Sequence, residues 1–150
     1  MKEFTIRTEL WLPRPREDVF AFFADARNLQ ELTPPWVRFE IITPLPVTMG
    51  IGTLIDYRIR VHGLPLRWRT EITEWEPARR FVDVQQRGPY KLWHHTHAFE
   101  ERDGGTLCTD EVRYCPPGGA WVNKLFVRRD VERIFAYRCE RLRELFPRPA

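Results

Sequence analysis

The sequence predicts an α+β fold in which a curved antiparallel sheet of seven strands wraps around one long C-terminal helix. Residues 3–12 alternate between apolar and polar side chains, and residues 36–114 keep strand character between turns. Residues 120–146 instead repeat their apolar positions with the period of an amphipathic helix. With 150 residues the chain is expected to form one domain, residues 1–150, that is large enough to enclose a small cavity.

Two short helices are predicted after the first strand. Pro13 and Pro15 end that strand. Apolar side chains then follow at helical spacing over residues 16–24, and a second short helix is expected over 25–32. Thr33-Pro34-Pro35 ends this helix, because the residue before a proline disfavours helical geometry.

Six strands follow in the order of an antiparallel meander, with turn signals at 44–52, 62–63, 77–78, 88–89 and 103–105. A turn at 62–65 places Tyr57 opposite Thr70 and Ile59 opposite Trp68. The other face of this hairpin carries four arginines, which cannot be buried without partners and are therefore expected to point outward: Arg58, Arg60, Arg67 and Arg69.

The last helix is the only predicted element long enough to cover the sheet, and a gap between the two would form a cavity. Its apolar stripe runs from Val127 to Leu145, but four apolar residues lie largely off that stripe: Trp121, Val122, Leu125 and Phe126. The helix is therefore expected to bend or restart near residue 126, or to pack its first turn against a loop. If exposed, these residues would form an apolar patch that requires a partner.

The composition excludes several function classes. No apolar run reaches 18 residues, so no integral membrane association is expected, and the Met1-Lys2-Glu3 start lacks the apolar stretch of a signal peptide, which favours the cytoplasm. The net charge of +3 arises from 21 Arg and 3 Lys spread along the chain, without the basic stripe of a nucleic-acid-binding protein. The three cysteines form no CxxC pair, which favours reduced structural thiols.

A histidine-rich strand carries the most specific functional signal. If side chains alternate regularly, Trp93, His95, His97 and Phe99 share one face of this strand, whereas His94 lies on the outer face. Pairing across the turn at 103–105 places His97 opposite Asp110. The same register gives three further pairs: Phe99 with Cys108, His95 with Val112, and Trp93 with Tyr114.

Pairing on the other side of this strand, across Gly88-Pro89, places Asp83 beside His97. The same register puts Phe81 beside Phe99 and Gln85 beside His95, and a slip by two residues would keep the face and change the partners. Asp83, His97 and Asp110 are therefore expected to form one row on the concave side of the sheet. Tyr137 or Arg138 of the long helix would approach this row.

Two carboxylates beside an imidazole raise its pKa, while burial lowers it, so such a row can hold a proton, bind a ligand oxygen or act as an acid/base. Three readings stay open: a buried polar network that only packs, a ligand-binding wall, and a catalytic site formed by His97, Asp110 and Asp83. His95 and His97 with an aspartate also resemble a metal triad, but the adjacent aromatic side chains favour a dry pocket, and we expect neither a metal nor a cofactor. The residues predicted to contact a ligand are Tyr57, Trp68, Thr70, Asp83, Gln85, Trp93, His95, His97, Phe99, Asp110, Tyr114, Phe135 and Arg138.

The order of elements, together with three motifs at residues 13–23, 75–83 and 105–107, resembles the helix-grip superfamily. That superfamily includes START lipid-transfer domains, birch-pollen-allergen-like proteins and the polyketide cyclase/dehydrase group. Residues 32–36, 88–90 and 93–99 resemble, more narrowly, a bacterial group of ligand-binding SRPBCC proteins. The resemblance implies a cavity between sheet and helix that holds a small hydrophobic or amphipathic molecule such as a lipid, polyketide or aromatic metabolite. A cyclase- or dehydratase-like enzyme and a protein-interaction module are the alternatives.

Overall fold

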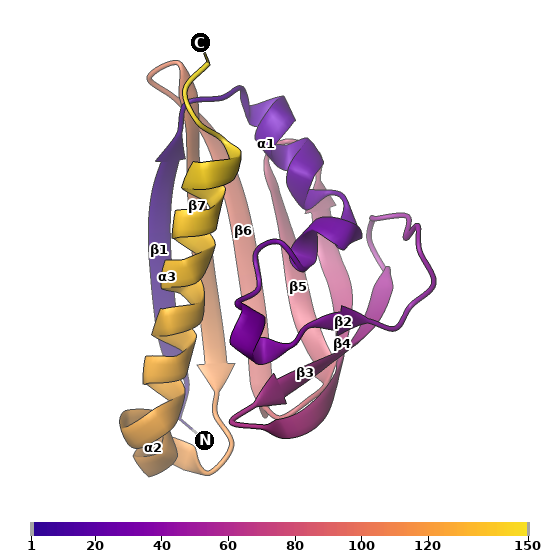
Figure 1. Ribbon diagram of the computed structural model, residues 1–150, viewed down its shortest axis with the longest axis vertical. Coiled ribbons are helices and arrows are strands. Elements are labelled where there is room, and N and C mark those ends of the chain that lie inside the picture. The colour runs from indigo at the N-terminus through magenta and orange to yellow at the C-terminus, as the bar shows by residue number, and fades with distance from the viewer. Residues whose placement is uncertain (1, 150) are drawn as a thin grey trace.

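The computed structural model describes residues 2–149 and contains a sheet of seven antiparallel strands in the order β1-β7-β6-β5-β4-β3-β2. The fold class expected from the sequence is confirmed. Figure 1 shows the long helix α3 lying along one part of the sheet, while β2, β3 and β4 curve away from it. The strands are β1 (Phe4–Leu12), β2 (Glu40–Ile41), β3 (Leu54–Val61), β4 (Leu64–Glu76), β5 (Arg80–Arg87), β6 (Leu92–Arg102) and β7 (Gly105–Cys115).

Short helical segments close one end of the sheet. Helix α1 (Arg16–Phe23) buries Val19, Phe20 and Phe23 against the sheet. The second helix is shorter than expected: only Ala26–Leu29 form a 3-10 turn, η1, and the Asp25 side chain caps its start by accepting a hydrogen bond from the N–H of Arg27. A further 3-10 turn, η2 (Pro35–Val37), follows the prolines that were expected to end the helical region.

The C-terminal helix changes its geometry near residue 126, as the off-stripe apolar residues indicated. Helix α2 (Gly119–Val122) continues through a π-helical turn, η3 (Asn123–Val127), into α3 (Arg128–Leu145). A π turn adds a residue to the helical repeat and rotates everything before it relative to the following stripe. Asn123 thereby points inward and accepts a 2.7 Å hydrogen bond from the hydroxyl of the fully buried Tyr114, while Trp121 remains exposed.

The register between β6 and β7 agrees with the prediction at all four pairs, including His97 opposite Asp110. The turn that joins these strands is a two-residue turn at Asp103-Gly104, and both residues have positive φ. Such a turn matches the twist of the strands and fixes their register without ambiguity.

Two other predicted registers are wrong by two residues. Tyr57 pairs with Trp68 rather than Thr70, and Ile59 pairs with Leu66, because the β3–β4 turn contains only His62 and Gly63. Asp83 pairs with His95 rather than His97. Phe81 likewise pairs with His97, so neither the Phe81–Phe99 nor the Gln85–His95 pair forms. A slip by two residues preserves the face, so each side chain still lies on the expected side of the sheet.

The arginines of the β3–β4 hairpin lie on its outer face, as expected. Arg69 forms an ion pair with Asp56 at 2.8 Å, and Arg58 lies 3.9 Å from Glu40. With the charged side chains outside, the concave face of β3 and β4 is left to apolar and aromatic side chains that face α3.

Candidate functional site

A cavity of about 720 Å³ lies between the concave face of the sheet and α3. Its wall is mostly apolar and comes from β3, β4, β5, β6, the segment around η1 and η2, and one face of α3. The sheet cannot close over α3 along its whole width because β2, β3 and β4 curve away from the helix (Figure 1). This separation creates the interior space.

Nine of the predicted ligand contacts line this cavity. They come from four strands on one side and from the long helix on the other: Tyr57, Trp68, Thr70, Asp83, Trp93, His95, His97, Phe135 and Arg138. Of the two helix residues expected near the polar row, Arg138 reaches it, whereas Tyr137 packs against Trp36 at the surface.

Four predicted ligand contacts lie behind the wall instead. Gln85 braces the β5–β6 connection, because its side-chain amide bonds both the N–H and the C=O of Tyr90. Phe99 packs in the core against Phe20 and Phe23. Tyr114 bonds Asn123, and Asp110 stands directly behind the two histidines.

Sequence reasoning missed much of the apolar wall. Val131 and Ile134 line the cavity, although both belong to the helical stripe that the sequence identified as core. Tyr90 also lines it, beside Trp68 and Trp93, because the β5–β6 connection folds back over the strands. Periodicity marks a side chain as inward-facing but does not distinguish a packed core from a cavity wall.

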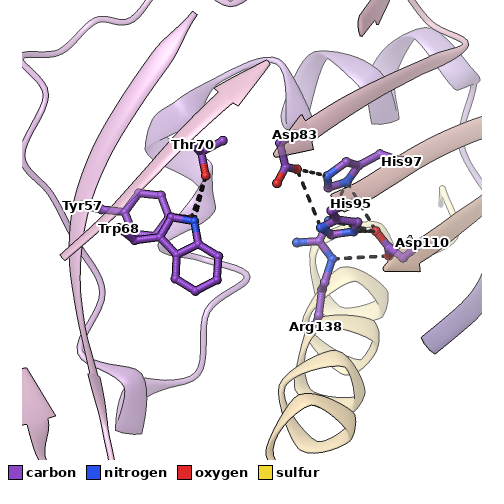
Figure 2. Close-up of polar contacts among 8 residues, drawn as sticks. All are labelled: Tyr57, Trp68, Thr70, Asp83, His95, His97, Asp110 and Arg138. Atoms are coloured by element: carbon purple, nitrogen blue, oxygen red, sulfur yellow. Dashed lines mark hydrogen bonds and ion pairs between the residues drawn. The ribbon is translucent and has the colours of Figure 1, made fainter. Parts of the chain in front are cut away.

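Two histidines and two aspartates form a closed polar cluster in the wall (Figure 2). His97 Nε2 lies 2.5 Å from Asp83 Oδ2, and His95 Nε2 lies 2.7 Å from Asp110 Oδ1. Each aspartate therefore bonds the histidine diagonal to it across the strand pair and not the one directly opposite. The other ring nitrogens face the remaining aspartate at longer distances. His95 Nδ1 lies 3.7 Å from Asp83 Oδ2, and His97 Nδ1 lies 3.4 Å from Asp110 Oδ1.

Ring stacking orders this cluster. The imidazoles of His95 and His97 stack with their centroids 3.7 Å apart, and the Phe81 ring stacks on the other face of His97 at 4.0 Å. Phe135 of α3 meets His95 edge-on. Each histidine ring is thus held between neighbours, which restricts its rotation.

Arg138 inserts into the cluster from α3 (Figure 2). Its Nε and Nη2 donate to the two oxygens of Asp110, each at 3.4 Å, and Nη2 lies 3.2 Å from Nδ1 of His97. A guanidinium only donates, so His97 Nδ1 is an acceptor in this arrangement and its proton lies on Nε2, toward Asp83. If His97 gains a second proton, Nδ1–H turns from an acceptor for Arg138 into a donor toward Asp110.

The charges of the cluster call for one additional proton. Two carboxylates and one guanidinium leave a net charge of −1, which a single imidazolium neutralises. Burial disfavours the charged form of His97, but the neighbouring carboxylates of Asp110 and Asp83 outweigh it and raise its pKa. Burial and the neighbouring His97 lower the pKa of His95, so His97 is the imidazole of the two that the cluster favours for an added proton. Although burial opposes ionisation of both aspartates, Arg138 holds the pKa of Asp110 well below its usual range, and the histidines lower that of Asp83.

A second polar group faces the cluster across the cavity (Figure 2). Trp68 Nε1 donates to Thr70 Oγ1 at 3.1 Å, and the Tyr57 hydroxyl lies 3.2 Å from the same oxygen. Burial raises the pKa of Tyr57, so its phenol is neutral. Because Thr70 and Tyr57 share one bond between two hydroxyls, one hydroxyl hydrogen has no acceptor among the described residues and is available to a ligand oxygen.

The side chains that offer a metal-ligand set are Asp83, His95 and His97, whose ligand atoms lie within 4.8 Å of one another. A shared ion requires the nitrogen lone pairs to converge, and these lie in the ring planes. The rings stack with only 27° between their planes, so the lone pairs run nearly side by side. The arrangement therefore fits a proton-sharing network better than a metal centre.

The comparisons with known proteins agree with this architecture. A protein from Chromobacterium violaceum superposes with a TM-score of 0.76 at 16% identity, covering 97% of this chain and 98% of that one. An aromatase/cyclase from a Streptomyces species gives 0.74 at 15% identity, covering 94% and 92%. The protein Ara h 8.0201 gives 0.69 at 17% identity, covering 97% and 98%. These likenesses establish the fold, and no curated protein matches the chain.

The described helices include none that is long and apolar enough to cross a membrane. The model of one protein family matches residues 12–136, which include α1, most of the sheet and the first half of α3 with the cavity residues Val131, Ile134 and Phe135. The chain therefore belongs to the polyketide cyclase / dehydrase and lipid transport family.

Proposed function

We propose that the protein binds a small amphipathic molecule, such as a lipid, polyketide or aromatic metabolite, in the cavity between the sheet and α3. The observation that carries the proposal is the wall itself: about 720 Å³ enclosed by apolar and aromatic side chains, with two facing polar groups. Natural small-molecule sites have this size and this combination of apolar walls and few polar groups.

The polar groups define what the ligand must offer. Asp83 is the cluster member most exposed to the cavity, with 18% of its side chain accessible against 5% for His97, and only its Oδ2 is bonded. A hydroxyl or phenol of the ligand would donate to its free Oδ1. A ligand oxygen on the other side would accept from Tyr57 or Thr70, and the flat faces of Trp68 and Trp93 favour rings between these two ends.

Ligand binding is tested by native mass spectrometry of the purified protein and by thermal unfolding with a panel of fatty acids, polyketides and phenols. A ligand at 100 times its Kd raises the melting temperature by about 5 to 10 °C. Ile134→Trp, which fills the cavity, is expected to abolish this shift, whereas Ile51→Trp at an exposed site is expected to keep it. The absence of any bound species or shift, or an unchanged shift in Ile134→Trp, would contradict the proposal.

A cyclase- or dehydratase-like activity is the second candidate, favoured by the His97–Asp83 pair at the cavity surface. In such a reaction Asp83 removes a proton from a carbon next to a ligand carbonyl, and the carbanion attacks a second carbonyl to form an alkoxide that takes this proton back. Asp83 then removes a second proton from the same carbon, the hydroxyl leaves as water after protonation from the cluster, a C=C bond forms, and the proton on Asp83 returns to the cluster. His97 is shielded by Asp83 and Phe81 and would act through Asp83.

The two candidates differ in their response to Asp83→Asn. A synthetic poly-β-ketone thioester is followed by the absorbance of its aromatic product. If the cluster is catalytic, Asp83→Asn and His97→Ala each lower turnover at least about a hundredfold while the substrate still binds. Equal turnover in wild type and both variants would leave only the binding function.

A further inference from the structure

Three large apolar side chains are exposed together where the C-terminal helix begins. Trp121 is 75% exposed, and Leu125 and Phe126 are each 57% exposed. Since η3 has the i→i+5 repeat, Leu125 and Phe126 both follow Trp121 by about one turn. We call these three residues the α2 patch. Exposed aromatic and aliphatic side chains in one group typically mark an interaction surface.

Cationic side chains surround the α2 patch. Residues 116–129 contain three basic residues, Lys124, Arg128 and Arg129, and no acidic residue. The ammonium of Lys124 lies 6.0 Å from the centre of the Trp121 ring. The apolar patch is therefore bordered by positive charge on its own helical segment.

All three lysines of the chain lie at this end of the molecule. Lys2 precedes Phe4, which pairs with Tyr114 at the end of β7. The N–H of Lys91 bonds the carbonyl of Cys115, the last residue of β7, from which the chain runs into α2. Figure 1 shows that β1 begins at the same end of the molecule as α2.

The acidic side chains near these cations already have partners. Glu3 pairs with Arg113, Asp130 with His62, and Glu132 with Arg128. Within residues 2–149, four exposed cations of this end have no carboxylate within ion-pair distance: Lys2, Lys91, Lys124 and Arg129.

The cavity extends to the same end. Its lining includes Pro117, which precedes α2, and Val127, the last residue of η3. It also includes the tip of the β3–β4 hairpin, where Leu64 is 62% exposed. His62 at that tip bonds Asp130 of α3 at 2.7 Å and so connects the hairpin to the helix beside the α2 patch.

We infer that this end of the molecule docks on an anionic lipid bilayer, with the α2 patch inserted at the interface and the lysines and arginines against the headgroups. Tryptophan prefers the membrane–water interface, and a helix with an apolar face and a cationic border binds anionic lipids. Lysine stems can lie along apolar surface while their ammonium groups stay in water. The inference does not depend on what the cavity binds.

The test is co-flotation of the full chain with vesicles of phosphatidylcholine alone and of phosphatidylcholine mixed with phosphatidylglycerol. Binding is expected only to the anionic vesicles and is expected to weaken as salt rises. Leu125→Ser with Phe126→Ser removes the apolar contact and should reduce binding by at least about tenfold. Lys124→Ala should reduce it about fivefold, the effect of one basic residue near an anionic surface. Brominated lipids should quench the tryptophan fluorescence of the wild-type protein, and they should quench that of Trp121→Phe less.

Ile51→Ser is the matched control, because Ile51 is 74% exposed but lies in the loop between β2 and β3. It should bind vesicles as wild type does, and circular dichroism should show every variant to be folded. No binding to anionic vesicles, or equal loss in Ile51→Ser, would overturn the inference. A concentration-dependent dimer in sedimentation velocity that the Leu125/Phe126 variant abolishes would overturn it in favour of a second copy of the chain.

Discussion

Replacing Arg138 by methionine tests whether the cluster behaves as one electrostatic unit. Methionine keeps much of the length and the apolar contact with Phe23 and Phe135, but it removes the cation that faces Asp110 at 3.4 Å. Both partners of this ion pair are about nine-tenths buried. Breaking a buried pair costs about 3 to 5 kcal/mol, which corresponds to a fall of roughly 6 to 20 °C in melting temperature for a domain of this size.

The loss should depend on pH with a defined sign. Without Arg138 the two carboxylates leave a charge of −2, so the pKa of His97, already raised by Asp110 and Asp83, rises further. A raised histidine pKa contributes stability that is complete below the unfolded value near 6.5 and disappears as pH rises through the folded pKa. The deficit should therefore be smaller at pH 6 than at pH 8, by up to about 1.4 kcal/mol for each further unit of pKa increase.

Urea unfolding of wild type and Arg138→Met at pH 6 and pH 8 measures this difference. Asp110→Asn is the opposing variant, because it leaves Asp83 and Arg138 balanced and should lower the pKa of His97. The unfolding free energy of Asp110→Asn should therefore be no higher at pH 6 than at pH 8. Equal deficits of Arg138→Met at both pH values, or a larger one at pH 6, would refute the proton-sharing account.

Three further predictions concern the wall and the helix. Thr70→Val leaves the Trp68 N–H without an acceptor and should lower the unfolding free energy by about 1 to 3 kcal/mol, measured by urea denaturation against Thr70→Ser, which should lose much less. Asn123→Leu should lower the unfolding free energy by a similar amount, because it leaves the buried Tyr114 hydroxyl without an acceptor. Adding Tyr114→Phe should recover part of this loss. If the losses of the two single variants simply add in the double variant, the hydrogen bond between these side chains does not contribute to stability. EDTA should leave the melting temperature unchanged, whereas a fall would show that the aspartate–histidine set holds a structural metal.

Much of the fold could be predicted from the sequence because the relevant signals are local. Alternation in residues 93–99 identifies the face of His95 and His97 whatever the partners of the strand are. The Asp103-Gly104 turn fixes the register of β6 and β7, since two residues with positive φ permit only one pairing. The same logic failed at His62-Gly63, where a longer turn was assumed.

The site required information that no local pattern contains. Asp83 was expected opposite His97, yet it stands opposite His95 and reaches His97 diagonally. The expected contact between Asp83 and His97 therefore forms between diagonal and not directly opposite residues. Gln85 and Tyr114 face the interior as predicted, but Gln85 hydrogen-bonds the backbone of Tyr90 and Tyr114 hydrogen-bonds Asn123. Sequence periodicity does not reveal these partners.

The sequence by itself determined the order of the elements, the inward face of each strand and the residues of the polar row, because side-chain periodicity and turn chemistry act over a few residues. Only the tertiary structure decided that the two histidines stack, that Arg138 joins them from α3, and that a cavity remains between the sheet and that helix. These features depend on how far β2, β3 and β4 curve away from α3 and on the rotation that the π turn introduces into the helix. Both follow from the packing of segments distant in sequence. Through that packing, a strand with three histidines becomes a cavity wall in which two of them join one polar cluster.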